Sequence, residues 1–150
     1  MPEPEPRPES AVPATREERT ALATRTGPGR ALVAVYAVFA IGATARSVEQ
    51  IATRFSNAPL AFLLSGLAAI VYVIATYCLA RASSTNRRIA GVSLVVETLG
   101  VLVVGTLSLT SRDLFPEATV WSDYGRGYLY IPVVLPVLGL IWLNRTGRTT

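Results

Sequence analysis

The sequence predicts an all-α, polytopic membrane protein: a four-helix transmembrane bundle that follows a disordered N-terminal tail. Its 150 residues are 51% hydrophobic and only 16% charged, and the mean hydropathy is +0.42. Because a soluble domain carries about 25% charged residues, this chain has too few charges to cover a surface in water. Buried helices of a soluble bundle would also pair an apolar stripe with a charged face, whereas residues 60–80 are apolar or small on every side.

Four long stretches with few charges divide the chain after residue 30. Three of them hold 15, 26 and 18 uncharged residues between successive arginines, and a fourth holds 23 residues with one charge, Glu97. A helix needs about 20 residues to cross about 30 Å of hydrocarbon. We therefore predict a transmembrane bundle over residues 31–145, with spans at about 31–51, 59–80, 89–110 and 127–143.

The two ends of the chain are predicted to be cytoplasmic tails. Residues 1–30 alternate prolines with charges near their start and offer little apolar surface to offset the entropy of ordering, so we expect them to be disordered. Their five arginines and five glutamates cancel, so no binding of nucleic acid is expected. The alternative for this tail is a docking arm for a cytoplasmic partner. Residues 146–150 form the second, short tail.

Arginine counts predict the orientation, because the chain has no lysine. The two tails and the connection at residues 81–88 carry ten arginines, against four on the opposite side. Since arginine and lysine gather on the cytoplasmic side, we expect a multi-pass protein of the cytoplasmic membrane with both termini in the cytoplasm. A competing hypothesis treats residues 31–45 as the core and cleavage site of a signal peptide. The long region before it, as acidic as it is basic, argues against cleavage.

Glu97 is the most informative polar residue, because it lies inside the third predicted span. An ionised acidic side chain there costs roughly 2.5 to 3.5 kcal/mol, so we expect it to face protein or water. Ala90, Ser93 and Gly100 share its helix face and allow close helix contact. In one interpretation protonated Glu97 donates a hydrogen bond that fixes the packing. In the other it exchanges a proton or binds a cation in a polar cavity.

A second polar group lies at the outer end of the first predicted span. Arg46 precedes Glu49 and Gln50 by three and four residues, a spacing that places the three side chains on one helix face. We predict a local cluster of these residues. The alternative is a bridge from Arg46 to Glu97, which must cover about 10 Å along the helix axis. Together with Glu97, these residues form the candidate intramembrane polar site.

The connection at residues 111–126 is expected to fold back onto the bundle. Its aromatic side chains suit the boundary of the membrane, so the simpler interpretation is an interfacial anchor. The alternative is an outward-facing recognition loop that uses Trp121, Asp123, Tyr124 and Arg126.

Two prolines predict a kink in the last span. Pro132 and Pro136 each remove one backbone donor from a helix. Neighbouring helices, hydroxyl groups or water can satisfy the freed carbonyls.

Several kinds of chemistry are excluded by residues that the sequence lacks. There is no histidine, and Cys78 is the single cysteine, so the usual zinc ligands and an internal disulfide are missing. The sequence has no phosphate-binding glycine loop and nothing that assembles a catalytic triad. We predict no enzymatic activity, no cofactor and no metal.

One group of motifs resembles a known family. The motifs are Ala118-Thr119-Val120-Trp121-Ser122, Tyr124-Gly125, Gly127-Tyr128, Pro132, Leu135-Pro136, Ala45-Arg46-Ser47, Gln50, Glu97, Gly100-Val101 and Val104-Gly105. Over roughly residues 31–143 the chain resembles a group of small, uncharacterised actinobacterial integral membrane proteins. The resemblance implies a membrane location and a four-span bundle, and it implies no reaction.

The predicted function is that of a structural or accessory subunit of the cytoplasmic membrane. Its expected contacts are the lipid bilayer and other membrane proteins, including copies of itself. The alternative is a small oligomeric transporter, coupled to protons or cations, in which Glu97 is the titrating site. A bundle of four short spans is narrow, so a conducting path would need a second copy.

Overall fold

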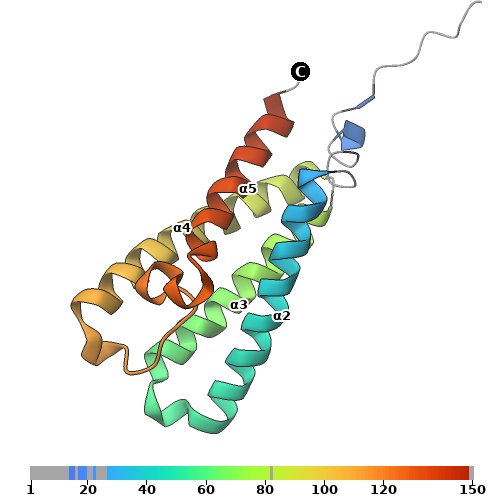
Figure 1. The fold of residues 1–150 in the computed structure, drawn as a ribbon. Helices are drawn as coiled ribbons and strands as arrows, with labels where there is room; N and C mark the ends of the chain where they lie inside the picture. The colour runs from blue at the N-terminus through green and yellow to red at the C-terminus, as the bar shows by residue number, and fades with distance from the viewer. Residues whose placement is uncertain (1–13, 16, 20–21, 23–26, 82, 149–150) are drawn as a thin grey trace, which may run out of the picture.

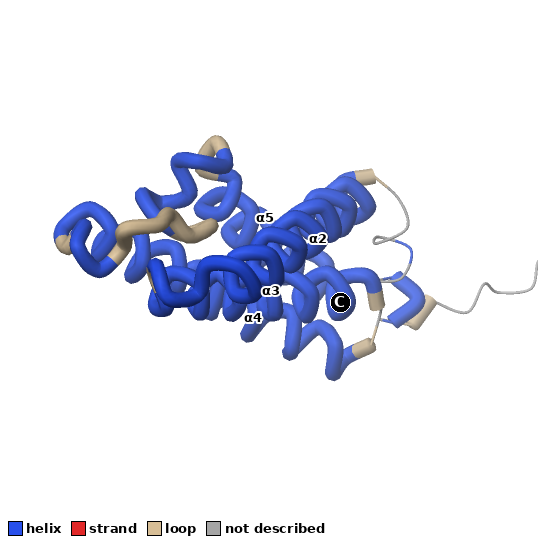
Figure 2. Tube along the Cα trace, turned by 90° about the horizontal axis from the view of Figure 1, so that it is seen from below, coloured by secondary structure: helices blue, strands red, loops and turns tan. Residues whose placement is uncertain are grey.

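The chain is all-helical in the computed structural model, which describes residues 14–15, 17–19, 22, 27–81 and 83–148 (Figure 1). The long helices are α2 (Pro28–Arg54), α3 (Pro59–Ala80), α4 (Ser84–Thr110) and α5 (Ile131–Arg148). Short 3-10 helices connect them: η1 (Phe55–Asn57), η2 (Arg112–Leu114) and η3 (Ser122–Tyr128). Figure 2 shows helices and loops but no strand in this described part of the chain. The predicted all-α class is confirmed.

The ends of the helices follow local signals as well as hydropathy. Prolines begin α2 and α3, where a missing N–H costs nothing, and α3 has the predicted bounds. The α4 helix begins before the predicted residue 89, because the Ser83 hydroxyl caps it by accepting from the Asn86 N–H at 3.1 Å.

The predicted tails fall partly outside the described residues. Most of residues 1–30 lies outside them, and the last residues of that tail belong to α2, which begins at Pro28. At the other end, α5 continues to Arg148, so residues 146–148 are helical rather than part of a tail. The predicted boundaries at residues 31 and 145 were therefore too narrow for the bundle.

Three helical segments are long and apolar enough to cross a membrane, and a bent pair would make a fourth span. The three are Pro28–Asn57, Pro59–Ala80 and Ser84–Thr110. The pair is η3 with α5, whose axes differ by 96°. The predicted last span over residues 127–143 therefore begins too early, because α5 begins at Ile131. Leu129 and Tyr130 take left-handed φ values of 56° and 59°, which a right-handed helix cannot accommodate.

The bend lies before the two prolines rather than between them. Pro132 occupies the first turn of α5, where its ring fits, and only Pro136 lies inside the helix. The chain has already turned at residues 129 and 130. This turn is separate from the kink predicted at the prolines, which stays a prediction.

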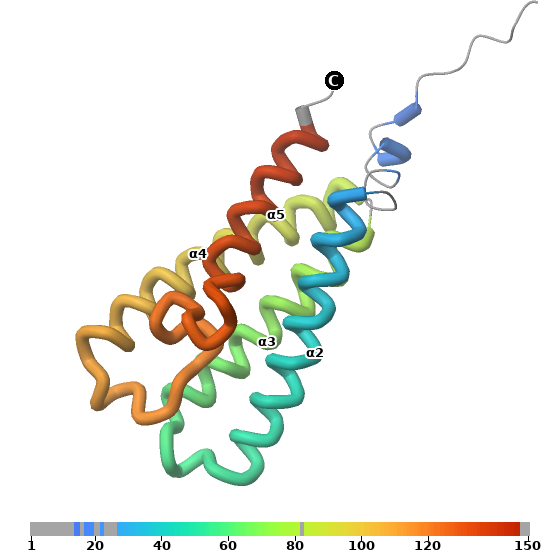
Figure 3. The backbone as a smooth tube through the Cα atoms, viewed as in Figure 1, coloured from blue at the N-terminus to red at the C-terminus, as the bar shows by residue number. Residues whose placement is uncertain are grey.

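The helices pack in chain order. The α2 helix packs on α3, α3 on α4, and α4 on both α5 and η3. As Figures 1 and 3 show, the start of α2 and the end of α5 lie at the same end of the bundle. The turn at η1 lies at the opposite end. This arrangement is the one that four successive crossings require.

The bundle has a mainly apolar core that contains several polar side chains, and its outer surface is apolar as well. Small and aromatic side chains fill the core, and buried polar groups lie among them: Ser47, Gln50, Ser65, Ser93, Glu97, Ser108, Thr119 and Ser122. Large aliphatic side chains are exposed on every long helix, among them Val38, Ile41, Leu63, Ile70, Val92, Leu99, Val134 and Leu138. Such a surface is unfavourable in water and favourable in lipid.

Gly100 provides a test of the packing between α4 and the connection that follows it. A Cβ added there would lie 2.7 to 2.9 Å from carbons of the Trp121 ring, whereas one added at Gly91 meets nothing within 4 Å. We expect the free energy of unfolding of Gly100→Ala to be lower than that of Gly91→Ala by about 1–3 kcal/mol, the usual cost of overpacking. Both glycines lie in α4, so the gain in helix propensity cancels.

Thermal unfolding of the two variants in detergent measures this difference. Equal stabilities would contradict the close packing of Trp121 on α4.

Candidate functional site

Glu97 lies in the centre of the bundle. Its side chain is 0% exposed, and the Tyr36 hydroxyl on α2 donates a hydrogen bond to Glu97 Oε2 at 2.8 Å. The expectation that Glu97 faces protein is confirmed. Ala90 and Ser93, on the same face of α4, are buried as well. Glu97 acts here as the acceptor, so it joins two helices that are not consecutive in the chain.

Two further side chains complete what we name the Glu97 cluster: Tyr36, Tyr72, Glu97 and Trp121. Tyr72 on α3 lies 6.2 Å from Tyr36 between ring centres, and Trp121 is buried in the same core cluster. Three buried polar atoms have no hydrogen-bond partner within geometric limits among the described residues: Glu97 Oε1, the Tyr72 hydroxyl and Trp121 Nε1. Each such atom costs about 1–3 kcal/mol, so the cluster is polar but incompletely satisfied.

Sequence reasoning found Glu97 and missed its tyrosine partners. The positions of the two tyrosines were a usable signal, because membrane proteins usually concentrate tyrosine near the interfaces. Tyr36 and Tyr72 instead lie within apolar stretches and are fully buried. A hydroxyl at that depth needs a polar partner, and Glu97 was the one acidic residue predicted deep inside a span, since Glu49 lies near the end of the first span.

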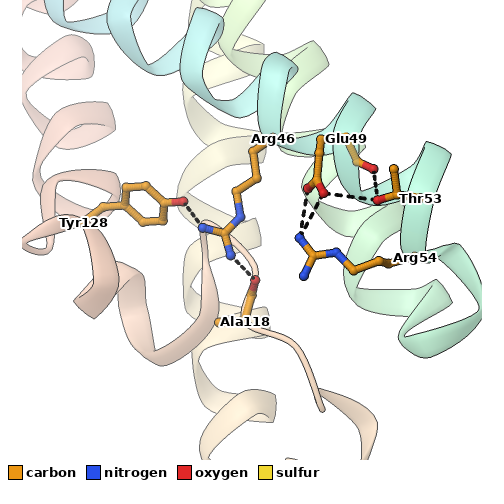
Figure 4. Close-up of polar contacts among 6 residues, drawn as sticks. All are labelled: Arg46, Glu49, Thr53, Arg54, Ala118 and Tyr128. Carbon is orange, nitrogen blue, oxygen red and sulfur yellow. Dashed lines mark hydrogen bonds and ion pairs between the residues drawn. The ribbon is translucent and has the colours of Figure 1, made fainter.

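Arg46 does not make the predicted local contacts. Its Nη1 donates to the Tyr128 hydroxyl at 2.9 Å and its Nη2 to the Ala118 carbonyl at 3.4 Å, as Figure 4 shows. It forms no hydrogen bond to Glu49, and none to Gln50 or Glu97. The predicted cluster and the alternative bridge were both wrong, because Arg46 reaches across to the segment after α4, which hydropathy alone could not place.

Glu49 and Gln50 make no hydrogen bond with Arg46, and each has different surroundings. Glu49 pairs with Arg54 at 2.9 Å near the end of α2, an exposed pair that adds little stability. Gln50 is 2% exposed, and its Oε1 has no partner among the described residues. The four residues of the predicted polar site therefore occupy separate places rather than one site.

The connection after α4 folds back onto that helix, as predicted. Trp121 is 1% exposed and packs on Gly100, so it is not available as an outward recognition residue, and that expectation was wrong for Trp121. Tyr124 packs on Gly105, and its hydroxyl lies 2.9 Å from that of Thr106.

Asp123 and Arg126 keep part of their side chains in the open. The backbone N–H of Asp123 donates to Ser108 Oγ at 2.8 Å, which ties this residue to α4. The Arg126 side chain is exposed. Tyr124, like Asp123, is half-buried, so three of the four residues in the proposed recognition loop remain at least partly accessible to a ligand or partner.

These residues border a cleft at the end of the bundle that carries η3, named here the Arg46 cleft. It has a volume of about 490 Å³ and is lined by Arg46, Ala118, Thr119, Ser122, Asp123, Arg126, Gly127 and Tyr128. Ring contacts connect it with the interior, because Phe39 lies 6.0 Å from Tyr128 and 5.6 Å from Tyr72 between ring centres. The Arg46 cleft and the Glu97 cluster are thus joined by a continuous run of aromatic side chains.

Comparisons with known proteins add no relative to this description. No protein-family model matches the chain, and neither a curated protein nor a solved structure matches it. The resemblance to small actinobacterial membrane proteins therefore stays a prediction.

A double-mutant cycle tests the bond at the centre of the Glu97 cluster. Tyr36→Phe leaves a buried carboxyl without its donor, and Glu97→Met leaves a buried hydroxyl without its acceptor, whereas the double variant removes both groups. We expect a coupling energy of about 1–3 kcal/mol in thermal unfolding in detergent.

Arg46→Ala combined with Glu97→Met is the control. No hydrogen bond joins Arg46 to Glu97, so their effects should add within about 0.5 kcal/mol. Coupling between Arg46 and Glu97, or additivity between Tyr36 and Glu97, would contradict the geometry.

Proposed function

We propose that the chain is a multi-pass protein of the cytoplasmic membrane, with both termini in the cytoplasm, that serves as a structural or accessory subunit. One observation carries the proposal: large aliphatic side chains cover the outside of the long helices while Glu97, Gln50 and the buried serines face inward. A hydrocarbon solvent makes both halves of this arrangement favourable. The excess of arginine at the end where α2 begins and α5 ends supports the orientation.

An apolar groove between α2 and α3 supports contacts within the membrane. It measures about 350 Å³ and is lined by Thr44, Ser47, Val48, Ile51, Gly66, Ala69, Ile70, Val73 and Ile74. Small residues such as Gly66 and Ala69 let another helix or an acyl chain approach closely. We propose lipid and other membrane proteins, including copies of this chain, as its partners.

Membrane extraction and reporter fusions test location and orientation together. The protein should stay in the membrane fraction in alkaline carbonate. A fluorescent protein fused after residue 148 should fold and fluoresce in the cytoplasm, and an alkaline phosphatase fused at residue 57, between α2 and α3, should be active outside.

The reciprocal fusions are the controls. Active phosphatase at residue 148 would show that the C-terminus lies outside and would contradict the proposed orientation. A monomer that stays folded in buffer without detergent would overturn the membrane location itself.

A second function is favoured by the unsatisfied atoms of the Glu97 cluster. Glu97 Oε1 and the Tyr72 hydroxyl are buried without a hydrogen-bond partner among the described residues. A carboxylate oxygen in this state suits a proton or a small cation, and ionisable residues at such depth mark ion paths in other membrane proteins. We therefore propose, as the alternative, an oligomeric proton- or cation-coupled transporter that uses Glu97.

Proteoliposome flux separates the two functions. If the protein is a carrier, flux of protons or cations should be lost in Glu97→Gln, which removes the charge and keeps the size. Glu49→Gln is the matched control, because Glu49 is exposed and pairs with Arg54. The carrier function fails if the wild type conducts nothing, or if both variants conduct like the wild type.

A further inference from the structure

Two arginines line the Arg46 cleft, and one of them is held in place. Arg46 is oriented by its bonds to the Tyr128 hydroxyl and the Ala118 carbonyl. A guanidinium carries five N–H donors, so these two bonds leave three. Arg126 lines the same cleft, and its side chain makes no hydrogen bond or ion pair within the described residues. The cleft therefore combines one fixed and one adaptable cation.

Tyr128 adds a neutral donor to the same cleft. Its hydroxyl oxygen accepts from Arg46, so its own proton is free to be donated elsewhere. The ring is positioned by Phe39, 6.0 Å away between ring centres. A bound anion would thus meet an O–H group beside a guanidinium, both already oriented before it arrives.

The single acidic residue of the cleft faces competing contacts. Asp123 lines the Arg46 cleft, but it also lines a neighbouring cleft of about 210 Å³ together with Ser108 and Arg112. Ser108 Oγ donates to Asp123 Oδ1 at 3.5 Å and accepts from the Asp123 N–H. Asp123 is therefore held on the wall between the two clefts. With two arginines against one aspartate, the Arg46 cleft keeps a positive balance.

We propose that the Arg46 cleft is a binding site for a phosphate group. Guanidinium groups bind phosphate through pairs of parallel N–H···O bonds, and Arg46, Arg126 and Tyr128 line the cleft and supply such donors together with a hydroxyl. The volume of about 490 Å³ suits a phosphate with a small attached group. The same chemistry serves a phospholipid headgroup and a free phosphate. This site does not depend on an accessory role for the protein.

Binding measurements on the purified full chain test the site with two probes. The first is inorganic phosphate, added in detergent at constant ionic strength and followed by the shift in thermal unfolding. The second is phosphatidylglycerol in nanodiscs, compared with phosphatidylcholine. Stabilisation by inorganic phosphate identifies a free phosphate as the ligand, and stabilisation by phosphatidylglycerol alone identifies a headgroup.

Variants connect the binding to the cleft. Arg126→Gln should weaken binding of the effective probe about tenfold or more, because it removes a charged donor without breaking a bond of the fold. Tyr128→Phe should weaken it by about threefold to tenfold, because it removes one neutral donor and one of the two bonds that orient Arg46. Arg112→Gln is the matched control, since it removes the same charge from the neighbouring cleft, and it should bind like the wild type.

Two results would overturn the proposal. One is that neither probe stabilises the wild type. The other is that Arg112→Gln weakens binding as much as Arg126→Gln, because binding would then reflect the general charge of the surface rather than this cleft.

Discussion

The hydrogen bond from Tyr36 to Glu97 is the interaction around which the bundle is organised. It joins α2 to α4, while Tyr72 brings α3 to the same place. A buried carboxyl group is costly unless it is hydrogen-bonded, so the bond from Tyr36 favours the packing of α2 beside α4. Aliphatic packing alone would be less specific, because lipid tails compete equally well for aliphatic surface. The polar contacts at Glu97 therefore determine which helices pack together, whereas the apolar outer surface is compatible with several arrangements.

Aromatic contacts run from the Glu97 cluster to the end of the bundle where the Arg46 cleft lies. Tyr72, Phe39 and Tyr128 follow one another at 5.6 and 6.0 Å between ring centres, and Tyr128 ends at Arg46. Arg46 in turn holds the Ala118 carbonyl, which belongs to the connection after α4. One series of contacts thus connects the Glu97 cluster with the Arg46 cleft. The position of η3 over α4 depends on side chains from α2 that lie far from it in the sequence.

Hydropathy predicted the elements of the fold because the long stretches with few charges are the ones that form the long helices. For α3 even the bounds were correct, since charges or prolines limit both ends. The partners of the polar residues were another matter. Helical spacing predicted that Arg46 would pair with Glu49. A long arginine side chain can instead bond any acceptor within its reach, and Arg46 bonds Tyr128, which lies 82 positions away in the sequence. The burial of Glu97 was predictable because an acidic side chain is costly to expose to hydrocarbon. Its bond to Tyr36 was not, because that bond depends on how the helices pack.

The segment η3 shows how irregular backbone survives in such a protein. Asp123 and Tyr124 take left-handed φ values of 49° and 57°, which cost about 1–3 kcal/mol each. Two glycines of α4 offset this strain, because Gly100 admits the Trp121 ring and Gly105 admits Tyr124. Backbone that leaves the helix at membrane depth is tolerated where protein covers it. The absence of a Cβ on α4 is what allows that cover, so these glycines determine the shape of the Arg46 cleft without lining it.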